Sequence, residues 1–493
     1  MPLGSDPTPI VIENFAGLAT VPDAKIRPGG MRPNQARLLE NIEPDNGNLR
    51  VRLGHKRLKV ARVDSTRPIL GFWRAYKGTD GSRKQIVHTR NKLWTLSGSA
   101  VASITGSLTL TSGHAHTGFS YQDIFYGSNG VNPWWKWSFS GKATAVATPG
   151  ENYEIVFAFE EKIVHARGAS NKDKVAWSDE GLPATYQSLH FFFYPPDRSD
   201  ELTLAYPLAG EIILGTPQKI GKTVGGLPPR AVVDIELGKG CASYHSAAVV
   251  HGWLYYVGIH GDVYRTDGNV VQEVSSDLAL SDVNTGTKRM LRGVGEDDRY
   301  YRLSYPSRAT GATFPDRIIT YDSLFDQWYG PHKVMRASAW FEFRTPGDDG
   351  HVAGGTPSGY AAVFYSGSSD AGARITGVYE GPVFPGPDPS YRAAIDEFEI
   401  QGKAIASGTA TVGIYYDRGA TVSSIGTVSL KTTGPVEGDR DSTSVSRAWV
   451  FDPKKVKFAQ TPRLWQPRVS IAQKSGRAEV SLVRFLVKQL KYR

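Results

Sequence analysis

The stretch from Arg292 to Pro331, RGVGEDDRYYRLSYPSRATGATFPDRIITYDSLFDQWYGP, decides the fold class. Aromatic or apolar residues alternate with polar ones over Arg299–Tyr305, and again over Arg317–Tyr321 after a polar bridge that contains Gly and Pro. Alternation with a period of two, bounded by turn residues, predicts half-buried antiparallel strands. The following Asp322–Trp328 predicts a tight turn, in which a short acid folds back on the backbone and a large ring packs over the next strand.

Weaker versions of this unit recur along the chain. Each is a strand, a short polar turn and a second strand with an aromatic residue near its end. They lie at residues 85–97, 122–137, 162–178, 252–268 and 361–366. Their spacing is irregular, very roughly 40 residues, which is the length of a four-stranded propeller blade. The pattern predicts a β-propeller, and a pair of β-sandwiches would also produce it.

The composition divides the chain into three parts. Residues 379–389, YEGPVFPGPDP, read as a linker because of their prolines and glycines. After it, about a hundred residues with five or more alternating segments predict a small β-sandwich. We therefore expect an all-β chain. It has an N-terminal arm and first strand at 1–60, a β-propeller-like domain at 61–380 and a C-terminal β-sandwich at 390–493.

Composition narrows the class of protein further. The 493 residues are 40% hydrophobic and carry a formal net charge of +9, which permits contact with nucleic acid without indicating it. The single Cys241 excludes an intrachain disulfide and a cysteine-rich metal site. No basic start with a long apolar run opens the chain, and no stretch has the roughly 18 apolar residues of a membrane helix. We expect a soluble protein made in a reducing cytoplasm.

No specific catalytic motif is present. The sequence lacks a Gly-x-Ser-x-Gly elbow, a phosphate-binding Gly-Lys-Ser/Thr loop and a His-Glu-x-x-His pair. His114 and His116 would share one face of a strand but lack a third metal ligand. The adjacent carboxylates of Glu160–Glu161, Glu296–Asp298 and Asp348–Asp349 occur in turn-like contexts, which favours solvated loops over a glycosidase pair. The sequence therefore predicts no enzyme, cofactor or metal.

Three stretches are candidates for contacts with other molecules. In 50–59, basic side chains share one face of a strand, which suits a nucleic-acid channel, a solvated face or a subunit contact. The aromatic pair in 134–137 suits a base- or sugar-stacking platform, or a strand with rings packed on both faces. Consecutive aromatics at 191–193 place rings on both faces of a strand, so the same chain or a neighbouring subunit must cover them. The predicted subunit-contact or channel residues are Arg50, Arg52, Lys56, Trp134, Trp135, Phe191, Phe192 and Phe193.

The order of several motifs resembles a known group of proteins. The N-terminal region runs from Phe15-Ala-Gly-Leu18 through 28–41, PGGMRPNQARLLEN, to 47–54, GNLRVRLG. It resembles the opening of structural proteins of tailed bacteriophages, in which a Gly-Gly-Leu start precedes a Gly-Leu-x-x-Arg-x-Gly strand. Ala16 stands where that group has its first Gly. The segments 175–186 and 318–328 look like the group's Trp-Ser-Asp-x-Gly-x-Pro segment and Tyr-Asp…Trp blade turn.

Within that group, the chain is most similar to the tail hub or nozzle proteins of short-tailed phages, also described as packaged-DNA stabilisation proteins. The resemblance implies a virion protein, assembled in the host cytoplasm, that forms a sixfold ring below the portal and adaptor. Such a ring would continue the DNA exit channel and help retain packaged DNA. It would contact the adaptor and portal complex, tail fibres or spikes, and transiently DNA. The alternative is a carbohydrate-binding or glycan-hydrolysing propeller of the tail.

Overall fold

The computed structural model describes the greater part of the chain. The described residues are 8–19, 32, 34–59, 61–97, 100–147, 150–276, 278, 280–342, 352–385, 392–404, 407–416, 422–431, 446–450, 464–475 and 478–490. Within these ranges the only helices are three short 3-10 turns, η1 (Tyr244–Ser246), η2 (Leu280–Asp282) and η3 (Thr285–Met290). All other regular structure is β, as predicted.

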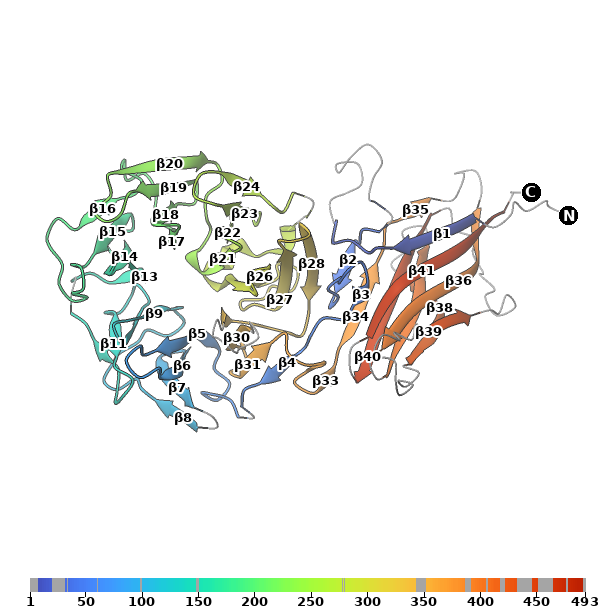
Figure 1. Ribbon diagram of the computed structural model, residues 1–493, viewed down its shortest axis with the longest axis horizontal. Helices are drawn as coiled ribbons and strands as arrows, with labels where there is room; N and C mark the ends of the chain where they lie inside the picture. Colours follow the sequence, from blue (N-terminus) through green and yellow to red (C-terminus); the bar gives the residue numbers. More distant parts are fainter. Residues whose placement is uncertain are drawn as a thin grey trace.

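Seven blades of four antiparallel strands follow one another around a ring in the described chain (Figure 1). Blade 1 is β5 (Ile69–Tyr76), β6 (Arg83–Thr89), β7 (Lys92–Ser97) and β8 (Ala100–Ser103). Blade 2 is β9 (Thr117–Tyr121), β10 (Ile124–Ser128), β11 (Trp135–Trp137) and β12 (Thr144–Ala145). Blade 3 is β13 (Tyr153–Phe159), β14 (Lys162–Gly168), β15 (Lys174–Trp177) and β16 (Phe191–Phe193). Blade 4 is β17 (Leu204–Leu208), β18 (Glu211–Gly215), β19 (Lys219–Val224) and β20 (Ala231–Leu237).

The remaining three blades complete the ring. Blade 5 is β21 (Ala248–Val250), β22 (Trp253–Val257), β23 (Val263–Thr266) and β24 (Val271–Glu273). Blade 6 is β25 (Arg292–Glu296), β26 (Tyr300–Tyr305), β27 (Arg317–Asp322) and β28 (Gln327–His332). Blade 7 is β29 (Ala339–Glu342), β30 (Val352–Gly355), β31 (Ala361–Phe364) and β4 (His55–Arg57). The prediction of a β-propeller main domain is confirmed.

The stretch Arg292–Pro331 is one blade lacking only its last residue. The two predicted strands are β26 and β27, and the sequence on either side adds β25 and β28. The predicted turn is confirmed: the Oδ1 of Asp322 accepts the backbone N–H of Leu324 at 3.0 Å. The ring of Trp328 packs on Tyr321, with ring centroids 5.0 Å apart. A short acid and a large ring therefore shape this hairpin as the sequence pattern predicts.

The ring is closed by a strand from the N-terminal region. Strand β4 pairs with β31 in an antiparallel register that sets Lys56 opposite Val363. On its other side β4 contacts the hairpin of β32 (Ser369–Asp370) and β33 (Ala373–Arg374). Blade 7 is thus built from two distant segments of the chain. This exchange ties the start of the propeller to its end.

The second domain is a β-sandwich beside the ring (Figure 1). One sheet contains β1 (Thr8–Glu13), β41 (Ala478–Leu490), β36 (Arg392–Ala404), β39 (Ser446–Val450) and β3 (Leu49–Arg50). The other contains β2 (Leu38–Glu40), β34 (Thr376–Glu380), β40 (Leu464–Ser475), β37 (Ser407–Tyr416), β38 (Val422–Lys431) and β35 (Phe384–Pro385). Trp465 and Phe485 meet between the sheets at 5.1 Å.

The N-terminal residues belong to both domains instead of forming an arm. Strands β1 and β3 pair with β41, β2 pairs with β34, and β4 completes blade 7. The predicted linker at 379–389 is strand in part, because β34 ends at Glu380 and β35 follows; residues 386–389 lie outside the described ranges. A single hydrophobic cluster runs from the sandwich through Phe15 and Leu18 into blades 5 and 6.

Candidate functional site

Arg52 is an internal residue, which corrects its prediction as a channel or subunit-contact side chain. It is 0% exposed, and its guanidinium pairs with both carboxylate oxygens of Asp370 at 2.7 and 3.0 Å. Its Nε donates to the Oδ1 of Asn41 at 3.0 Å, and Nη2 donates to the carbonyl of Lys333 at 3.2 Å. The alternation of 50–54 predicts a shared face for Arg50 and Arg52, but of the two only Arg52 is buried at the domain junction.

Burial pushes the pKa of Asp370 upward, but the hydrogen bonds from His55 and Arg52 outweigh it and hold this pKa at about 2. A carboxyl whose folded-state pKa is depressed contributes stability above its ordinary pKa. That contribution is lost as the pH falls toward 2. The junction is therefore held by a charge pair that only strong acid removes.

Arg50 and Lys56, the other two basic candidates, lie apart from Arg52. Arg50 is in β3 of the sandwich and forms an ion pair with Asp45 across a tight turn. Lys56 is exposed on β4 of blade 7. The three side chains therefore make no common basic surface.

Trp134 and Trp135 are also internal, which corrects their prediction as contact residues. They are 2% and 0% exposed. Trp134 stacks on Tyr126 at 5.2 Å, and Trp135 packs on Phe125 at 5.6 Å. The indole N–H of Trp135 donates to Nδ1 of His116 at 3.3 Å. Of the two interpretations, the strand with rings packed on both faces holds.

Phe191, Phe192 and Phe193 form β16, the outermost strand of blade 3, and all three are half-buried. Phe192 faces the core between blades 3 and 4. Phe191 and Phe193 contact each other on the opposite face at 5.4 Å. Only cations lie over these two rings among the described contacts: Lys174 at 4.9 Å and Arg198 at 4.2 Å. The chain's own core therefore covers one face of β16.

The carboxylate pairs occupy structural positions where they are described. Glu160 and Glu161 form the β13–β14 turn with positive φ, and the Oε2 of Glu160 accepts the N–H of Leu227 at 2.9 Å. Glu296 is buried beside Arg302, and Asp297 and Asp298 form the β25–β26 turn. The pair at 348–349 lies outside the described residues.

Glu296 belongs to a buried ionic cluster at the junction of the domains. The guanidinium of Arg302 is shared by Glu296 and Glu43, and its Nη1 lies 2.6 Å from the Oε1 of Glu43. Burial, together with the charge of Glu43, raises the pKa of Glu296 to about 7 against the attraction of Arg302. Arg302 and His332 overcome burial at Glu43 and lower its pKa. One cation between two carboxylates favours protonation of the more deeply buried one.

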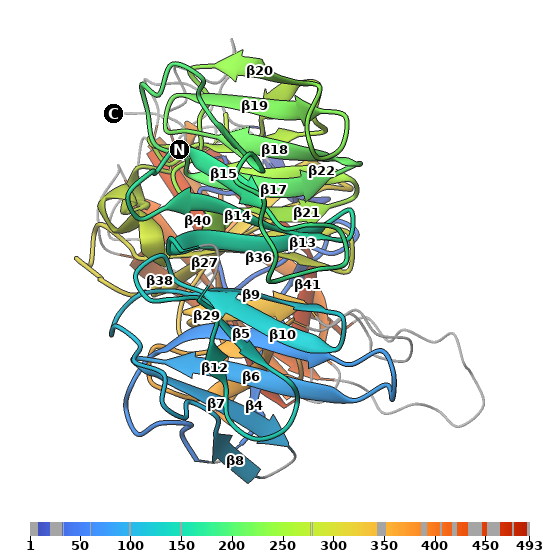
Figure 2. The ribbon, with the colours of Figure 1, turned by 90° about the vertical axis from the view of Figure 1, so that its left-hand side faces the viewer.

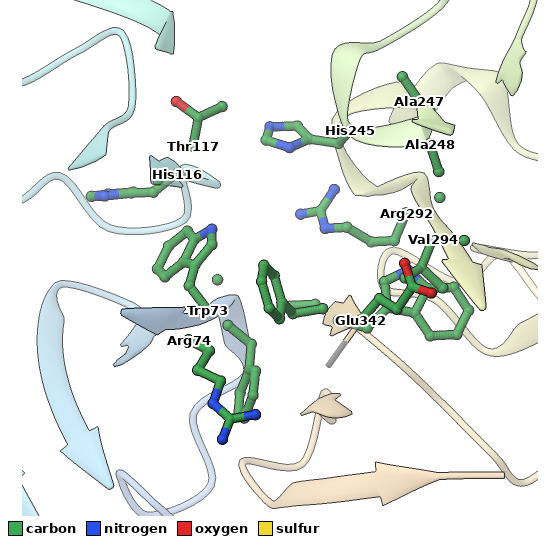
Figure 3. Close-up of a pocket in the computed structure, with 18 of the residues that line it drawn as sticks. Trp73, Arg74, His116, Thr117, His245, Ala247, Ala248, Arg292, Val294 and Glu342 are labelled. Carbon is green, nitrogen blue, oxygen red and sulfur yellow. The ribbon is translucent and has the colours of Figure 1, made fainter. Parts of the chain in front are cut away.

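The centre of the propeller holds a cavity of about 860 Å³. Innermost strands from six blades, β5, β9, β17, β21, β25 and β29, line it together with η1 (Figure 3). The aromatic lining comes from Phe72, Trp73, Tyr76, Tyr206, Tyr244, Trp340 and Phe341. The charged and imidazole lining comes from Arg74, Arg83, His116, His245, Arg292 and Glu342. A volume of this size, with apolar walls and a few polar groups, is typical of a small-molecule site.

Close packing of blades 5 and 6 positions Arg292 and His245 together. A Cβ on Gly293 would lie 2.0 Å from the carbonyl oxygen of Ser246, so only glycine permits this approach. The hydroxyl of Tyr301 donates to that same carbonyl at 2.7 Å. η1, which carries His245, is thereby fixed against β25, which carries Arg292. Figure 3 shows both side chains pointing into the cavity.

Arg292 is held by backbone oxygens and not by a carboxylate. Its Nε donates to the carbonyl of Ser338 at 2.8 Å, and its Nη1 donates to the carbonyls of Arg289 and Leu291. The residue is 5% exposed, and its buried Nη2 has no hydrogen-bond partner among the described residues. Burial lowers the pKa of Arg292 to about 10, so the guanidinium remains charged at neutral pH.

Burial and the charges of Arg292, Arg289 and Arg167 lower the pKa of His245, which is therefore neutral at pH 7. Arg167 and Arg289 are themselves paired with Glu154, at 2.9 and 3.6 Å. Arg167 also pairs with Glu201 at 3.0 Å, so of these three cations only Arg292 lacks a carboxylate partner among the described residues. Neutralisation of Arg292 would require an acceptor from outside the described chain.

His116 has a different environment from the one expected of a metal ligand. Its ring stacks on His88 at 3.8 Å, and burial lowers the pKa of both imidazoles. Because Nδ1 of His116 accepts from Trp135, its proton lies on Nε2. Across the described residues, no group of three or more His, Cys, Asp or Glu side chains is arranged to hold a metal ion.

Sequence patterns did not identify the Arg292–His245 pair. Arg292 opens the stretch that decides the fold class, whereas His245 lies in no segment for which the sequence predicts a structure, and nothing in their spacing places them together. The alternating glycines of 292–296, RGVGE, are the one available signal, because glycine inside a strand marks a close backbone approach. The glycine pattern does not identify the segment whose backbone packs against this strand.

Comparison with known proteins identifies no family. No family model matches the chain, and no curated protein matches it. Solved structures with a similar arrangement include YCF48 from Cyanidioschyzon merolae, at 8% identity over 63% of this chain and 98% of that one, with a TM-score of 0.42. BamB from Moraxella catarrhalis is 8% identical over 74% of this chain and 98% of that one, with a TM-score of 0.41. At these scores the likenesses carry no argument about function.

No helix in the described part of the chain is long and apolar enough to span a membrane.

Proposed function

We propose that the chain is a structural subunit of the tail of a short-tailed bacteriophage, a hub or nozzle that assembles as a sixfold ring. The order of the motifs at 15–18, 28–41, 47–54, 175–186 and 318–328 supports this assignment. The first of these motifs and parts of the next two lie at the junction of the two domains. There, the N–H of Leu18 donates to the carbonyl of Trp328 at 2.8 Å, and Arg52 pairs with Asp370.

The observation that carries the proposal is the apolar outer rim of blades 3 and 4. Leu189, just before β16, is 81% exposed, and Leu237, at the end of β20, is 69% exposed. Phe191 and Phe193 lie on the same outer edge, and Val233 on β20 is 39% exposed. Figure 2 looks onto this side of the propeller. Apolar groups gathered on outer strands are typical of an interaction surface, and identical copies in a ring would cover them.

In this proposal, DNA passes along the axis of the ring and not through the propeller itself. The central cavity of about 860 Å³ has the volume of a small-molecule site. The adaptor and portal complex would lie on one side of the ring, and tail fibres or spikes would attach at its periphery. The assembled particle is a virion, formed in the host cytoplasm.

Sedimentation of the purified chain, alone and with its cognate adaptor and portal complex, tests the proposal. We expect a ring-sized species that Phe193→Ser combined with Leu237→Ser converts to monomers. Leu324→Ser is the matched control, because Leu324 is 68% exposed in the β27–β28 turn of blade 6. A wild-type chain that stays monomeric in both conditions would refute the ring.

A carbohydrate-binding propeller of the tail is the second candidate. The aromatic lining of the cavity favours it, because rings such as Trp73, Tyr244 and Trp340 can stack on sugar faces. Binding to a panel of host surface glycans, lost in Trp73→Ala, is the expected result for this function. Absence of binding to every glycan in the panel would rule out the carbohydrate-binding function.

A further inference from the structure

The central cavity contains a buried cation whose counter-ion the described chain does not supply. Arg292 is 5% exposed, and three backbone carbonyls orient its guanidinium. Its Nη2 is buried without a partner. An unpaired charge inside a protein is costly, and proteins normally pair such charges. Carbonyl dipoles hold the group in place but do not neutralise it.

Other charged and imidazole side chains surround Arg292 in and near the cavity. Figure 3 shows the guanidinium pointing into the space between His245 and Trp73. Arg289 and Arg167 lie close enough to His245 to shift its titration, and both already pair with Glu154. Among the described lining residues the one carboxylate is Glu342, which accepts the N–H of Asp297 at 3.2 Å. Glu342 is therefore engaged at the β25–β26 turn and does not pair with Arg292.

We propose that this cavity binds a small oxyanion, the carboxylate or phosphate group of a small molecule, with Arg292 as its charged anchor and His245 as a second contact. The planar guanidinium suits both groups, because its parallel N–H bonds match two oxygens of a carboxylate or phosphate. The aromatic walls would hold the uncharged part of the ligand. This site is independent of ring assembly.

The neighbourhood of His245 gives the site a pH dependence. The groups around His245 are Arg292 from β25, Arg289 from η3, Arg167 from β14 and His116 just before β9, and Glu154 of β13 pairs with Arg167 and Arg289. An anion beside Arg292 would offset these positive charges and raise the pKa of His245 toward its ordinary value. Binding would then be accompanied by proton uptake and be tighter at acidic than at alkaline pH.

Isothermal titration calorimetry of the full chain tests the site. Inorganic phosphate and glucose 6-phosphate form the phosphate arm, citrate and glucuronate form the carboxylate arm, and glucose is the neutral reference. We expect saturable 1:1 binding in at least one arm, which identifies the group, and none to glucose. Glucose binding as tightly as the charged ligands, or no binding in either arm, overturns the proposal.

Variants separate a specific site from general positive charge. Arg292→Gln is expected to weaken binding by about tenfold or more, the effect of losing one charge-assisted hydrogen bond. Arg90→Gln is the matched control: Arg90 is exposed in the β6–β7 turn, outside the cavity, and its removal costs the same unit of charge. We expect it to leave affinity unchanged. Equal binding by wild type and Arg292→Gln refutes the anchor.

Arg292 also joins blades 6 and 7 through its hydrogen bond to Ser338, so a second variant separates loss of the anion site from loss of folding. His245→Ala leaves the hydrogen bonds of Arg292 in place and provides the second measurement. Titrations at pH 6 in two buffers of different ionisation enthalpy should show proton uptake in wild type and its loss in His245→Ala. Unchanged proton uptake in this variant would contradict the assignment of His245.

Discussion

Arg52 and Arg50 are two residues apart, have the same charge and the same strand face by alternation, and yet have opposite environments. Arg52 is buried between the domains against Asp370, whereas the pair of Arg50 and Asp45 retains 25% and 38% side-chain exposure. Removing one partner of a buried pair leaves an uncompensated charge, whereas exposed pairs are screened by solvent. The cost of losing either charge therefore depends on its surroundings.

Arg52→Met is expected to lower the free energy of unfolding by about 3–5 kcal/mol. Arg50→Gln, the matched control, should cost less than about 1 kcal/mol. Urea unfolding at pH 7 measures both. Similar costs for the two variants would show that the buried Arg52–Asp370 pair contributes no more to stability than the exposed Arg50–Asp45 pair.

Glu296 provides a pH-dependent prediction at the same scale. Its folded-state pKa of about 7 lies above the ordinary value of 4.5, so the native state binds a proton that the unfolded chain releases between these values. Stability from this group is complete below pH 4.5 and is lost as the pH rises toward 7. Glu296→Gln cannot ionise and escapes the loss.

Relative to wild type, Glu296→Gln should therefore gain about 2–3 kcal/mol in free energy of unfolding between pH 5 and pH 8. Denaturant titrations at the two pH values give this difference. Glu180→Gln, at an acid whose side chain is 69% exposed, serves as the control and should show no such gain. A constant offset for Glu296→Gln at both pH values would mean that the carboxyl is ionised throughout.

At the scale of elements, β4 determines whether the propeller ring closes. It lies inside its sheet, between β31 and β32, so a proline there removes a ladder hydrogen bond. Lys56→Pro should destabilise the chain by about 1–3 kcal/mol, the cost of a buried group left unpaired. Lys56→Ala keeps the backbone N–H and should change stability by less than about 0.5 kcal/mol, since the side chain is exposed. The midpoint temperatures of thermal unfolding of the two variants are compared. Equal midpoints would show that β4 is not hydrogen-bonded within the blade that closes the ring.

Local alternation predicts strands well but does not identify their partners. The pattern of 299–305 and 317–321 predicted β26 and β27, because turn residues and period two are properties of neighbouring positions. The same reasoning found a strand near 49–54 but could not assign β4 to a blade that begins at Ala339. Pairing across such a separation depends on the closed ring, and no local signal encodes it. The Arg292–His245 site was missed for the same reason.

Two other sequence patterns predicted outward contacts for residues that are buried in the structure. A basic alternating strand and an aromatic cluster both suggested outward contacts, yet Arg52 and Trp135 are 0% exposed. Charge pairing with Asp370 and stacking in blade 2 satisfy them internally. Phe191 and Phe193 keep the outward orientation that the sequence suggested. The contribution of these two rings to an interface stays a prediction.

At the scale of the whole molecule, the two domains share a core and N-terminal strands. Phe15 from the N-terminal region packs on Tyr379 of the sandwich at 5.2 Å, and both belong to the cluster that reaches blades 5 and 6. Domains linked in this way should unfold together, because neither keeps its complete set of strands without the other. Differential scanning calorimetry should show one transition whose calorimetric and van't Hoff enthalpies agree. Two resolved transitions would mean that the domains are independent.

A core shared by the two domains suits the proposed ring, in which each subunit contacts its neighbours. The apolar rim on blades 3 and 4 is the surface that would meet the next copy, and the junction would keep the sandwich at a fixed angle to it. The net charge of +9 is compatible with a position near packaged DNA.

Electron cryomicroscopy of the purified chain mixed with its cognate adaptor and portal complex tests the ring most directly. We predict closed sixfold rings below the adaptor, with blades 3 and 4 of each subunit buried against its neighbour and an open axial channel. Isolated monomers, or rings in which the outer strands β16 and β20 face solvent, would contradict the account.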